Sequence, residues 1–237
     1  MASILLVGLP RDLQGAVSRA LVSHGHTVAA VGDVAAALRS AGQSAPALTI
    51  ANADLPGFDG LYLCQAMRAA PNGADSSVIF LSNAQSLADK LSGFAAGADD
   101  YITTPLQMAQ LMLRVQALLR RVGSLTEEAP ENTPYLRHNT ITLNPQTGEV
   151  WLSGHSVTLT PVETRLLAYL VASAGRPASA EELLCQVWEQ LPGAGDPTLV
   201  RVHMRHLRAK LEANPAAPQL LKTVPGLGYC FKQDGAS

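Results

Sequence analysis

A regular alternation of two sequence patterns constrains the fold of the first half of the chain. Short apolar runs occur at five places, and each is followed by a longer stretch with the apolar spacing of a helix. Parallel strands need crossover connections, usually helices, so the alternation predicts a doubly wound parallel α/β sheet over residues 1–122. The predicted strands are residues 4–7, 27–31, 47–51, 78–81 and 100–103, and the predicted helices are residues 12–24, 34–41, 60–70, 86–97 and 106–122.

The second half shows a different order of patterns. Residues 123–135 hold three acidic residues and two prolines without apolar periodicity, which predicts a linker. Residues 136–160 alternate like a small antiparallel sheet, with predicted strands at residues 140–143, 149–152 and 155–159, and three predicted helices follow. Their capping signals are Thr160-Pro161-Val162-Glu163, Ser179-Ala180-Glu181-Glu182 and Asp196-Pro197, the last opening a helix that runs to about Asn214. A predicted hairpin at residues 225–228 completes a winged helix-turn-helix outline for residues 136–237.

The last predicted helix carries positive charge on one side. The formal net charge of the chain is −2, so affinity for nucleic acid must come from a local patch. At about 100° per residue, one side is an apolar stripe of Val200, Met204, Leu207 and Leu211. The other side carries Arg201, Arg205 and Arg208, and Lys210 lies nearby. Guanidinium groups pair with phosphates and guanine edges, so the pattern indicates double-stranded DNA as a partner, with a solvated basic face as the alternative.

Four motifs in this half resemble the OmpR/PhoB-type DNA-binding domain, in order and at the expected spacing. They are LTPVETRLL at residues 159–167, EELLCQVW at 181–188, VRVHMRHLRAKL at 200–211 and KTVPGLGYCF at 222–231. The resemblance implies that residues 196–213 enter the major groove. It implies base-edge contacts for His206 and Arg208, and phosphate contacts for Trp188, His203, Arg205, Thr223 and Tyr229.

Three residues depart from the pattern of that family. Arg201 stands where an aspartate is usual, which adds positive charge. His206 replaces a more usual arginine, which weakens bidentate readout of guanine. Pro225 replaces the usual arginine of the wing, so one wing contact is expected to be missing. Arg201 and Lys222 complete the predicted DNA-binding set.

The first 122 residues resemble the receiver domain of a response regulator over their full length. The motifs are ILLV at residues 4–7, DLPGFDG at 54–60, LS at 81–82 and GADDYITTP at 97–105. Phosphorylation in this family uses an acidic pair that holds Mg²⁺, a nucleophilic aspartate, a hydroxyl and a lysine. Here Gly8 and Leu9 replace the acidic pair, Asn52 replaces the aspartate and Thr104 replaces the lysine, whereas Ser82 supplies the hydroxyl.

These replacements predict a receiver that does not accept phosphate. Asparagine has no anionic oxygen to attack phosphorus, and glycine and leucine offer no carboxylate to a hard cation. Asp54 is the alternative nucleophile. It follows the predicted strand end by a few residues, where we expect it to face solvent or cap a turn.

The resemblance also implies a homodimer. In the family, a face made of the fourth helix, fifth strand and fifth helix pairs symmetrically, partly through interchain salt bridges. Asp100 and Arg114 match one such pair, whereas Lys90 has Gln110 at the position of its usual acidic partner. Because exposed ion pairs contribute only about 0–1 kcal/mol, dimerisation is expected to rest on apolar contacts. The candidates are Leu87, Leu91, Leu111 and Leu118.

We therefore expect a sequence-specific, DNA-binding transcriptional regulator that acts without phosphorylation and dimerises through its receiver, with RNA polymerase as a further candidate partner. In the alternative, the receiver docks a protein or a small ligand in the crevice around Gly8, Asn52, Ser82 and Thr104, and so modulates DNA binding.

Other classes of protein have less support. An enzyme is not expected, because the sequence lacks a nucleophile elbow, a Walker loop and a metal-ligand cluster. No cofactor is expected. The spacing of Cys64, Cys185 and Cys230 is typical of reduced thiols in a cytoplasmic protein. The chain shows neither a signal peptide nor an apolar run near the roughly 18–20 residues of a membrane span, so no membrane partner is expected.

Overall fold

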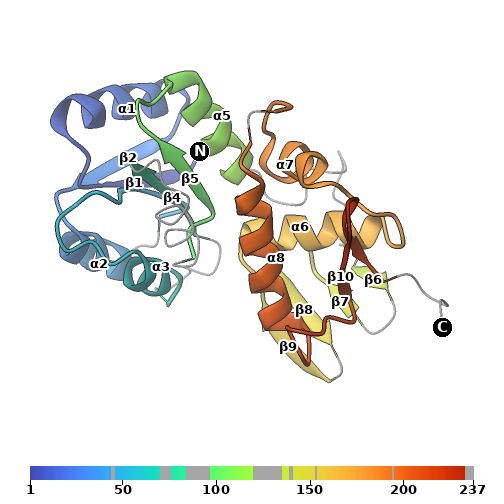
Figure 1. The fold of residues 1–237 in the computed structure, drawn as a ribbon. Coiled ribbons are helices and arrows are strands. Elements are labelled where there is room, and N and C mark those ends of the chain that lie inside the picture. The colour runs from blue at the N-terminus through green and yellow to red at the C-terminus, as the bar shows by residue number, and fades with distance from the viewer. Residues whose placement is uncertain are drawn as a thin grey trace. The chain divides into compact units, whose positions relative to one another are not determined.

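The computed structural model describes residues 1–43, 46–69, 76–83, 97–119, 135–138, 141–152, 154–193 and 195–232. The chain divides into two compact units, Met1–Leu119 and Arg120–Ser237 (Figure 1). The predicted linker lies outside the described residues, except for Tyr135. Within the described part of the chain, no helix combines the length and the apolar character needed to cross a membrane.

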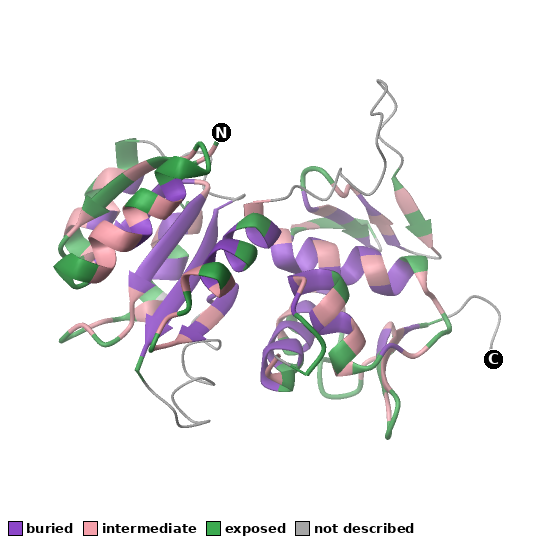
Figure 2. Ribbon diagram, turned by 90° about the horizontal axis from the view of Figure 1, so that it is seen from above, coloured by how far each residue is buried: buried purple, intermediate pink, exposed green. Residues whose placement is uncertain are grey.

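The first unit is built on a five-stranded parallel sheet in the order β2-β1-β3-β4-β5, which confirms the predicted fold. Its strands are β1 (Ser3–Val7), β2 (Thr27–Val31), β3 (Leu48–Asn52), β4 (Ser77–Ser82) and β5 (Asp100–Thr103). β4 is buried along its whole length, whereas the edge strand β2 is not (Figure 2). Central strands of such sheets are covered on both faces, which explains their continuous apolar sequences.

Four described helices cover this sheet. They are α1 (Arg11–Ser23), α2 (Val34–Gln43), α3 (Gly60–Ala69) and α5 (Met108–Leu119). α1 lies beside α5 on one face, and α2 lies beside α3 on the other (Figure 1). Between the sheet and the second pair, a core forms around Leu5, Val7, Leu63, Met67 and Phe80. The predicted helix at residues 86–97 lies outside the described residues, apart from its last position.

The second unit begins with a four-stranded antiparallel sheet in chain order. Its strands are β6 (Leu136–His138), β7 (Ile141–Leu143), β8 (Glu149–Leu152) and β9 (His155–Thr158). β6 was not predicted, because its sequence, Leu-Arg-His, holds a single apolar residue and so shows no alternation. The other three strands fall where the alternation predicts them, within one residue at each end.

Three helices follow: α6 (Pro161–Ala172), α7 (Ala180–Trp188) and α8 (Pro197–Leu211). Thr160 and Glu163 form the predicted capping box at the start of α6. At α7 only half of the predicted box forms. The Ser179 hydroxyl accepts the N–H of Glu182, but the Glu182 carboxylate accepts from Tyr169 and Arg176 instead. α8 ends three residues before the predicted limit.

The chain then forms the hairpin of β10 (Leu221–Val224) and β11 (Gly228–Phe231), called the wing below. Tyr229 in β11 exchanges two backbone hydrogen bonds, of 2.8 and 2.9 Å, with Ala178, just before α7. Gly228 has a φ of +125°, and a Cβ there would lie 2.0 Å from the Ala178 oxygen. Glycine is therefore required for the wing to reach this segment.

Candidate DNA-binding surface and receiver crevice

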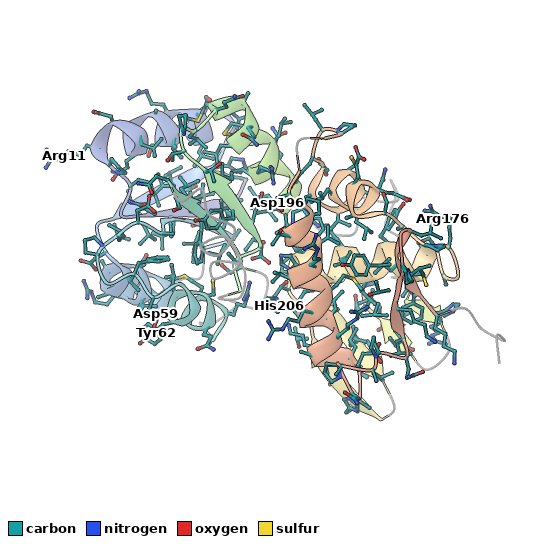
Figure 3. All side chains as sticks on the ribbon, in the orientation of Figure 1. Arg11, Asp59, Tyr62, Arg176, Asp196 and His206 are labelled. Atoms are coloured by element: carbon teal, nitrogen blue, oxygen red, sulfur yellow. The ribbon has the colours of Figure 1, made fainter. Side chains whose placement is uncertain are left out.

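α8 is held in place by its cap and its apolar side. The Asp196 carboxylate accepts the N–H of Thr198 at 2.9 Å, and Pro197 fixes the first helical residue. Figure 3 shows Asp196 at the start of the helix and His206 further along it. The predicted apolar stripe is buried, with no member more than 3% exposed: Val200, Met204, Leu207 and Leu211.

Two arginines of α8 are exposed. Arg201 and Arg205 lie four residues apart, which puts both on the same face of the helix. His206 beside them is half-buried. Long cationic side chains in this arrangement can reach phosphates or base edges along a groove.

Arg208, the third predicted arginine of this face, turns toward the wing. Its Nε and Nη2 donate to the carbonyl oxygen of Leu221 at 2.9 and 2.6 Å, and Nη2 also donates to the Thr223 hydroxyl at 2.8 Å. Its guanidinium carbon lies 5.9 Å from the centre of the Tyr229 ring. The structure thus brings together three predicted DNA-binding residues, Arg208, Thr223 and Tyr229, through contacts with one another. Lys222 on β10 is exposed.

Lys210 contributes less to the positive surface than its sequence position indicates. Its Nζ donates to the carboxylate of Glu163, on α6, at 2.6 Å. Burial of Glu163 would raise the pKa of its carboxyl group, but the charge and hydrogen bond of Lys210 outweigh that effect and hold the pKa below its usual value. Lys210 therefore anchors α8 to α6.

Trp188 and His203, for which phosphate contacts are predicted, are buried in this structure. Trp188 is 1% exposed and His203 is 2% exposed, and their ring centroids are 5.3 Å apart. His203 also lies edge-on to His206, with centroids 5.8 Å apart. The buried position of His203 follows from its place beside the apolar stripe of α8. In this conformation both rings pack inside the unit.

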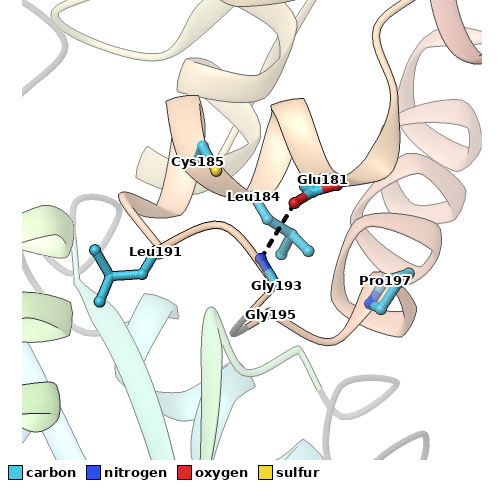
Figure 4. Close-up of a pocket in the computed structure, with 7 residues that line it drawn as sticks. All are labelled: Glu181, Leu184, Cys185, Leu191, Gly193, Gly195 and Pro197. Atoms are coloured by element: carbon cyan, nitrogen blue, oxygen red, sulfur yellow. Dashed lines mark hydrogen bonds between the residues drawn. The ribbon is translucent and has the colours of Figure 1, made fainter.

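A pocket of about 160 Å³ opens between α7 and the loop that leads to α8. The Glu181 carboxylate faces this loop and accepts the N–H of Gly193 at 3.1 Å (Figure 4). Cys185 and Leu191 also line the pocket, and Leu191 is 69% exposed. Glu181 therefore helps to fix the connection between the two helices.

The carboxyl ends of the receiver strands meet in the predicted crevice, where the protein's own groups bond to one another. Asn52, at the end of β3, donates from Nδ2 to the carbonyl oxygen of Gly8 at 3.1 Å and accepts the N–H of Asp54 at 3.0 Å. The side chain of Leu55 lies against Gly8, where a Cβ would come within 2.1 Å of it. Leu9 is buried.

Asp54 bonds to the end of β4. The Ser82 hydroxyl donates to one carboxylate oxygen at 2.5 Å, and the N–H of Asn83 donates to the other at 2.8 Å. Asp54 is exposed, as expected, but this tie to β4 was not foreseen. Thr104 is half-buried, and its N–H donates to the carbonyl oxygen of Ser82 at 2.9 Å. The sequence could not show which of these neighbouring polar groups would meet.

The Asp100–Arg114 pair forms within the chain, and the interchain bridge stays a prediction. Arg114 Nη1 donates to both Asp100 oxygens, at 2.9 and 2.7 Å, and both residues are buried. Burial raises the pKa of the Asp100 carboxyl group despite the opposing effect of Arg114. Leu111 and Leu118 are buried core residues, so they do not form an exposed apolar face. Lys90, Leu87 and Leu91 lie outside the described residues.

Comparisons with known proteins match both units of the chain. Residues 4–116 match the family model "Response regulator receiver domain", and residues 154–231 match "Transcriptional regulatory protein, C terminal". The chain is 36% identical over 232 residues to the DNA-binding dual master transcriptional regulator RpaA of Synechocystis sp., covering 98% of this chain and 95% of that protein. It is 32% identical to the response regulator MprA of Mycobacterium sp. (strain KMS), covering 97% of each chain.

Among solved structures, a mutant of RitR matches with a TM-score of 0.72, covering 98% of this chain and all of that one. At 24% identity this match supports the fold alone. The two family models and the full-length relatives together go further, because they match both units in the same order. The chain therefore belongs to the OmpR/PhoB-type response regulators, which are transcriptional regulators that bind DNA.

Proposed function

We propose that this regulator binds DNA without being switched by aspartyl phosphorylation. The observation that carries the proposal is the crevice at the strand ends. Asn52 stands at the end of β3 and bonds to Gly8, and the Leu55 side chain lies against Gly8. A phosphoryl group needs an anionic nucleophile and a cation with oxygen ligands, and these residues supply neither.

Asp54 does not replace the missing nucleophile in this proposal. Both of its oxygens already accept hydrogen bonds, from the Ser82 hydroxyl and the Asn83 N–H. Attack on phosphorus would use an oxygen that is already hydrogen-bonded to the end of β4, and it would bring a second anion toward a crevice whose lining contains Gly8 and Leu55. The same packing of Leu55 gives the alternative of a small ligand in this crevice less support.

The test is incubation of the full-length protein with acetyl phosphate and Mg²⁺, followed by intact-mass measurement. We expect no stable gain of a phosphoryl group, and DNA affinity that is the same before and after treatment. A phosphorylated aspartate, located by peptide mapping after trapping with hydroxylamine, would overturn the proposal.

The proposed DNA surface consists of the exposed side of α8 and the wing. Arg201 and Arg205 on the helix are exposed, as are Lys222 and Thr223 on the wing, and His206 lies half-buried beside the two arginines. The assignment rests on exposure, positive charge and the family. Trp188 and His203 support the surface from beneath. Such a regulator acts in the cytoplasm, where it meets chromosomal DNA, and RNA polymerase is a proposed further partner.

Dimerisation through the receiver is part of the proposal, and its expected basis is still apolar contact, although Leu111 and Leu118 are buried within the chain. The Asp100–Arg114 bridge is closed within one chain, so its charges are already neutralised. Leu113 on α5 is 49% exposed and offers apolar area to a second copy. Sedimentation of the wild type against Leu113→Asp tests this idea. A dimer that persists in the variant at the same concentration would contradict it.

A further inference from the structure

We propose that Arg208 acts as a positioning residue that fixes the wing to α8, and that reading of bases falls to its exposed neighbours. The inference deepens the proposed DNA surface and rests on it. Three hydrogen bonds, of 2.9, 2.6 and 2.8 Å, join the guanidinium to Leu221 and Thr223, and the Tyr229 ring lies beside it. To present its Nη1–Nη2 edge to a base, Arg208 would have to give up the bond from Nη2 to Thr223, and to present its Nε–Nη2 edge it would have to give up the bonds to Leu221.

Glu212 completes the attachment by bonding to the same residue, Leu221. It follows α8 directly and lies four residues after Arg208, so both side chains leave the helix on one face. Its carboxylate accepts three consecutive backbone N–H groups, those of Gln219, Leu220 and Leu221, at 2.8, 2.9 and 2.8 Å. The N–H of Leu221 thus bonds to Glu212 and its carbonyl oxygen bonds to Arg208.

This clamp, formed by Arg208 and Glu212 around the backbone of Leu221, acts where the wing begins. Leu221 is the first residue of β10, and Lys222 and Thr223, which face DNA in the proposal, follow it directly. Charge-assisted hydrogen bonds are shorter and stronger than neutral ones, so the clamp holds the register and direction of β10 relative to α8. The side chains of α8 that enter the groove and the wing residues that contact the DNA backbone are then held in a fixed relative position.

The charge of α8 is consequently divided between two roles. Arg208 and Lys210 bond within the unit, to Leu221 and Glu163 respectively. Arg201 and Arg205 are exposed. A base-edge role therefore fits Arg201 and Arg205 better than it fits Arg208.

The experiment begins with selection of a preferred duplex from a random-sequence library by the wild-type protein. Arg208→Lys retains the charge but loses the planar fork. We expect it to select the same bases, to bind the selected duplex about tenfold more weakly, and to show faster amide exchange across residues 221–231 without DNA. Loss of preference at one base position, with unchanged exchange in the wing, would overturn the inference.

Glu212→Gln is the decisive companion variant. Removing a negative charge favours DNA binding electrostatically, so a loss of affinity must come from a displaced wing. We expect a loss similar to that of Arg208→Lys, with unchanged exchange in α6 as evidence that the unit stays folded. Glu149→Gln on β8 is the matched control and should bind at least as tightly as the wild type. Glu212→Gln binding as tightly as this control would contradict the clamp. If instead the wild type selects no sequence, the proposed DNA surface itself fails, and not this inference.

Discussion

The receiver crevice and the junction between α8 and the wing both use one carboxylate to hold a strand end. In the receiver, Asp54 accepts a hydroxyl and one backbone N–H at the end of β4. In the second unit, Glu212 accepts three backbone N–H groups before β10. The first region has Gly8, Leu9, Asn52 and Thr104 at its strand ends, whereas the second carries charged side chains and uses some of them internally.

The comparison teaches that a charged residue in a family position is not automatically available to a ligand. Asp54 and Arg208 are both candidates from sequence alone, one for phosphate and one for a base. In the structure both have their polar atoms engaged by the protein. Because a hydrogen bond to a charged group is stronger than a neutral one, such engagement opposes a change of partner.

The largest expected effect comes from the exposed arginines, and it sharpens the contrast with Arg208. Arg201→Ala together with Arg205→Ala should weaken binding to a selected duplex by about tenfold for each arginine removed, and should reduce the slope of log K against log salt by about 0.9 for each phosphate that is no longer neutralised. Fluorescence anisotropy at several salt concentrations measures both. Arg19→Ala on the receiver is the control. Unchanged binding in the double variant would reject α8 as the DNA-binding element.

Gly228→Ala tests how far the wing depends on its attachment to Ala178. The new Cβ would lie 2.0 Å from a backbone oxygen, at a φ of +125°, so the hairpin must move. We expect a loss of about 2 kcal/mol or more in unfolding free energy and a parallel loss of DNA affinity. Gly226→Ala is the matched control, since its φ is +76° but nothing lies within 4 Å. Equal effects of the two substitutions would show that the contact with Ala178 does not matter.

Glu163→Gln probes a charge that is used internally. Its carboxyl pKa is lowered on folding, so the ion pair contributes stability above the ordinary pKa of 4.5 and loses it as the pH falls through the lower folded value. Because Lys210 is 33% exposed, we expect the variant to lose only about 1–2 kcal/mol at pH 7. Its unfolding free energy should also change less than that of the wild type below pH 4.5. If urea denaturation gave the wild type and the variant the same change in unfolding free energy with pH, the contribution of the Glu163–Lys210 ion pair would be contradicted.

The smallest effect is expected at Asp54. Asp54→Ala removes two hydrogen bonds at an exposed site, which should cost about 1 kcal/mol in receiver stability and leave DNA affinity unchanged.

Asn52→Asp restores a carboxylate at the end of β3 but leaves Gly8, Leu9 and Thr104 in place. We expect no stable phosphoryl group on this variant after acetyl phosphate treatment. A gain of one phosphoryl group in the measured mass of the variant would contradict this expectation.

Much of the fold could be predicted from local patterns. The parallel sheet follows from the five apolar runs, and the start of α6 follows from Thr160 and Glu163, because strand burial and helix capping depend on neighbours in sequence. β6 escaped prediction because Leu-Arg-His holds a single apolar residue and so shows no alternation. The burial of Trp188 escaped as well, since it depends on how α7 packs against His203 on α8.

Sequence by itself determined which chemical groups stand at the receiver crevice and on α8: an amide at position 52, and arginines at 201, 205 and 208. Only the tertiary structure decided which of them are free to meet a ligand. Arg205 and Arg208 are the same residue type three positions apart, yet one is exposed and the other bonds to the wing. The physical reason is that a partner such as Leu221, distant along the chain, becomes a neighbour only when the wing packs against the helix.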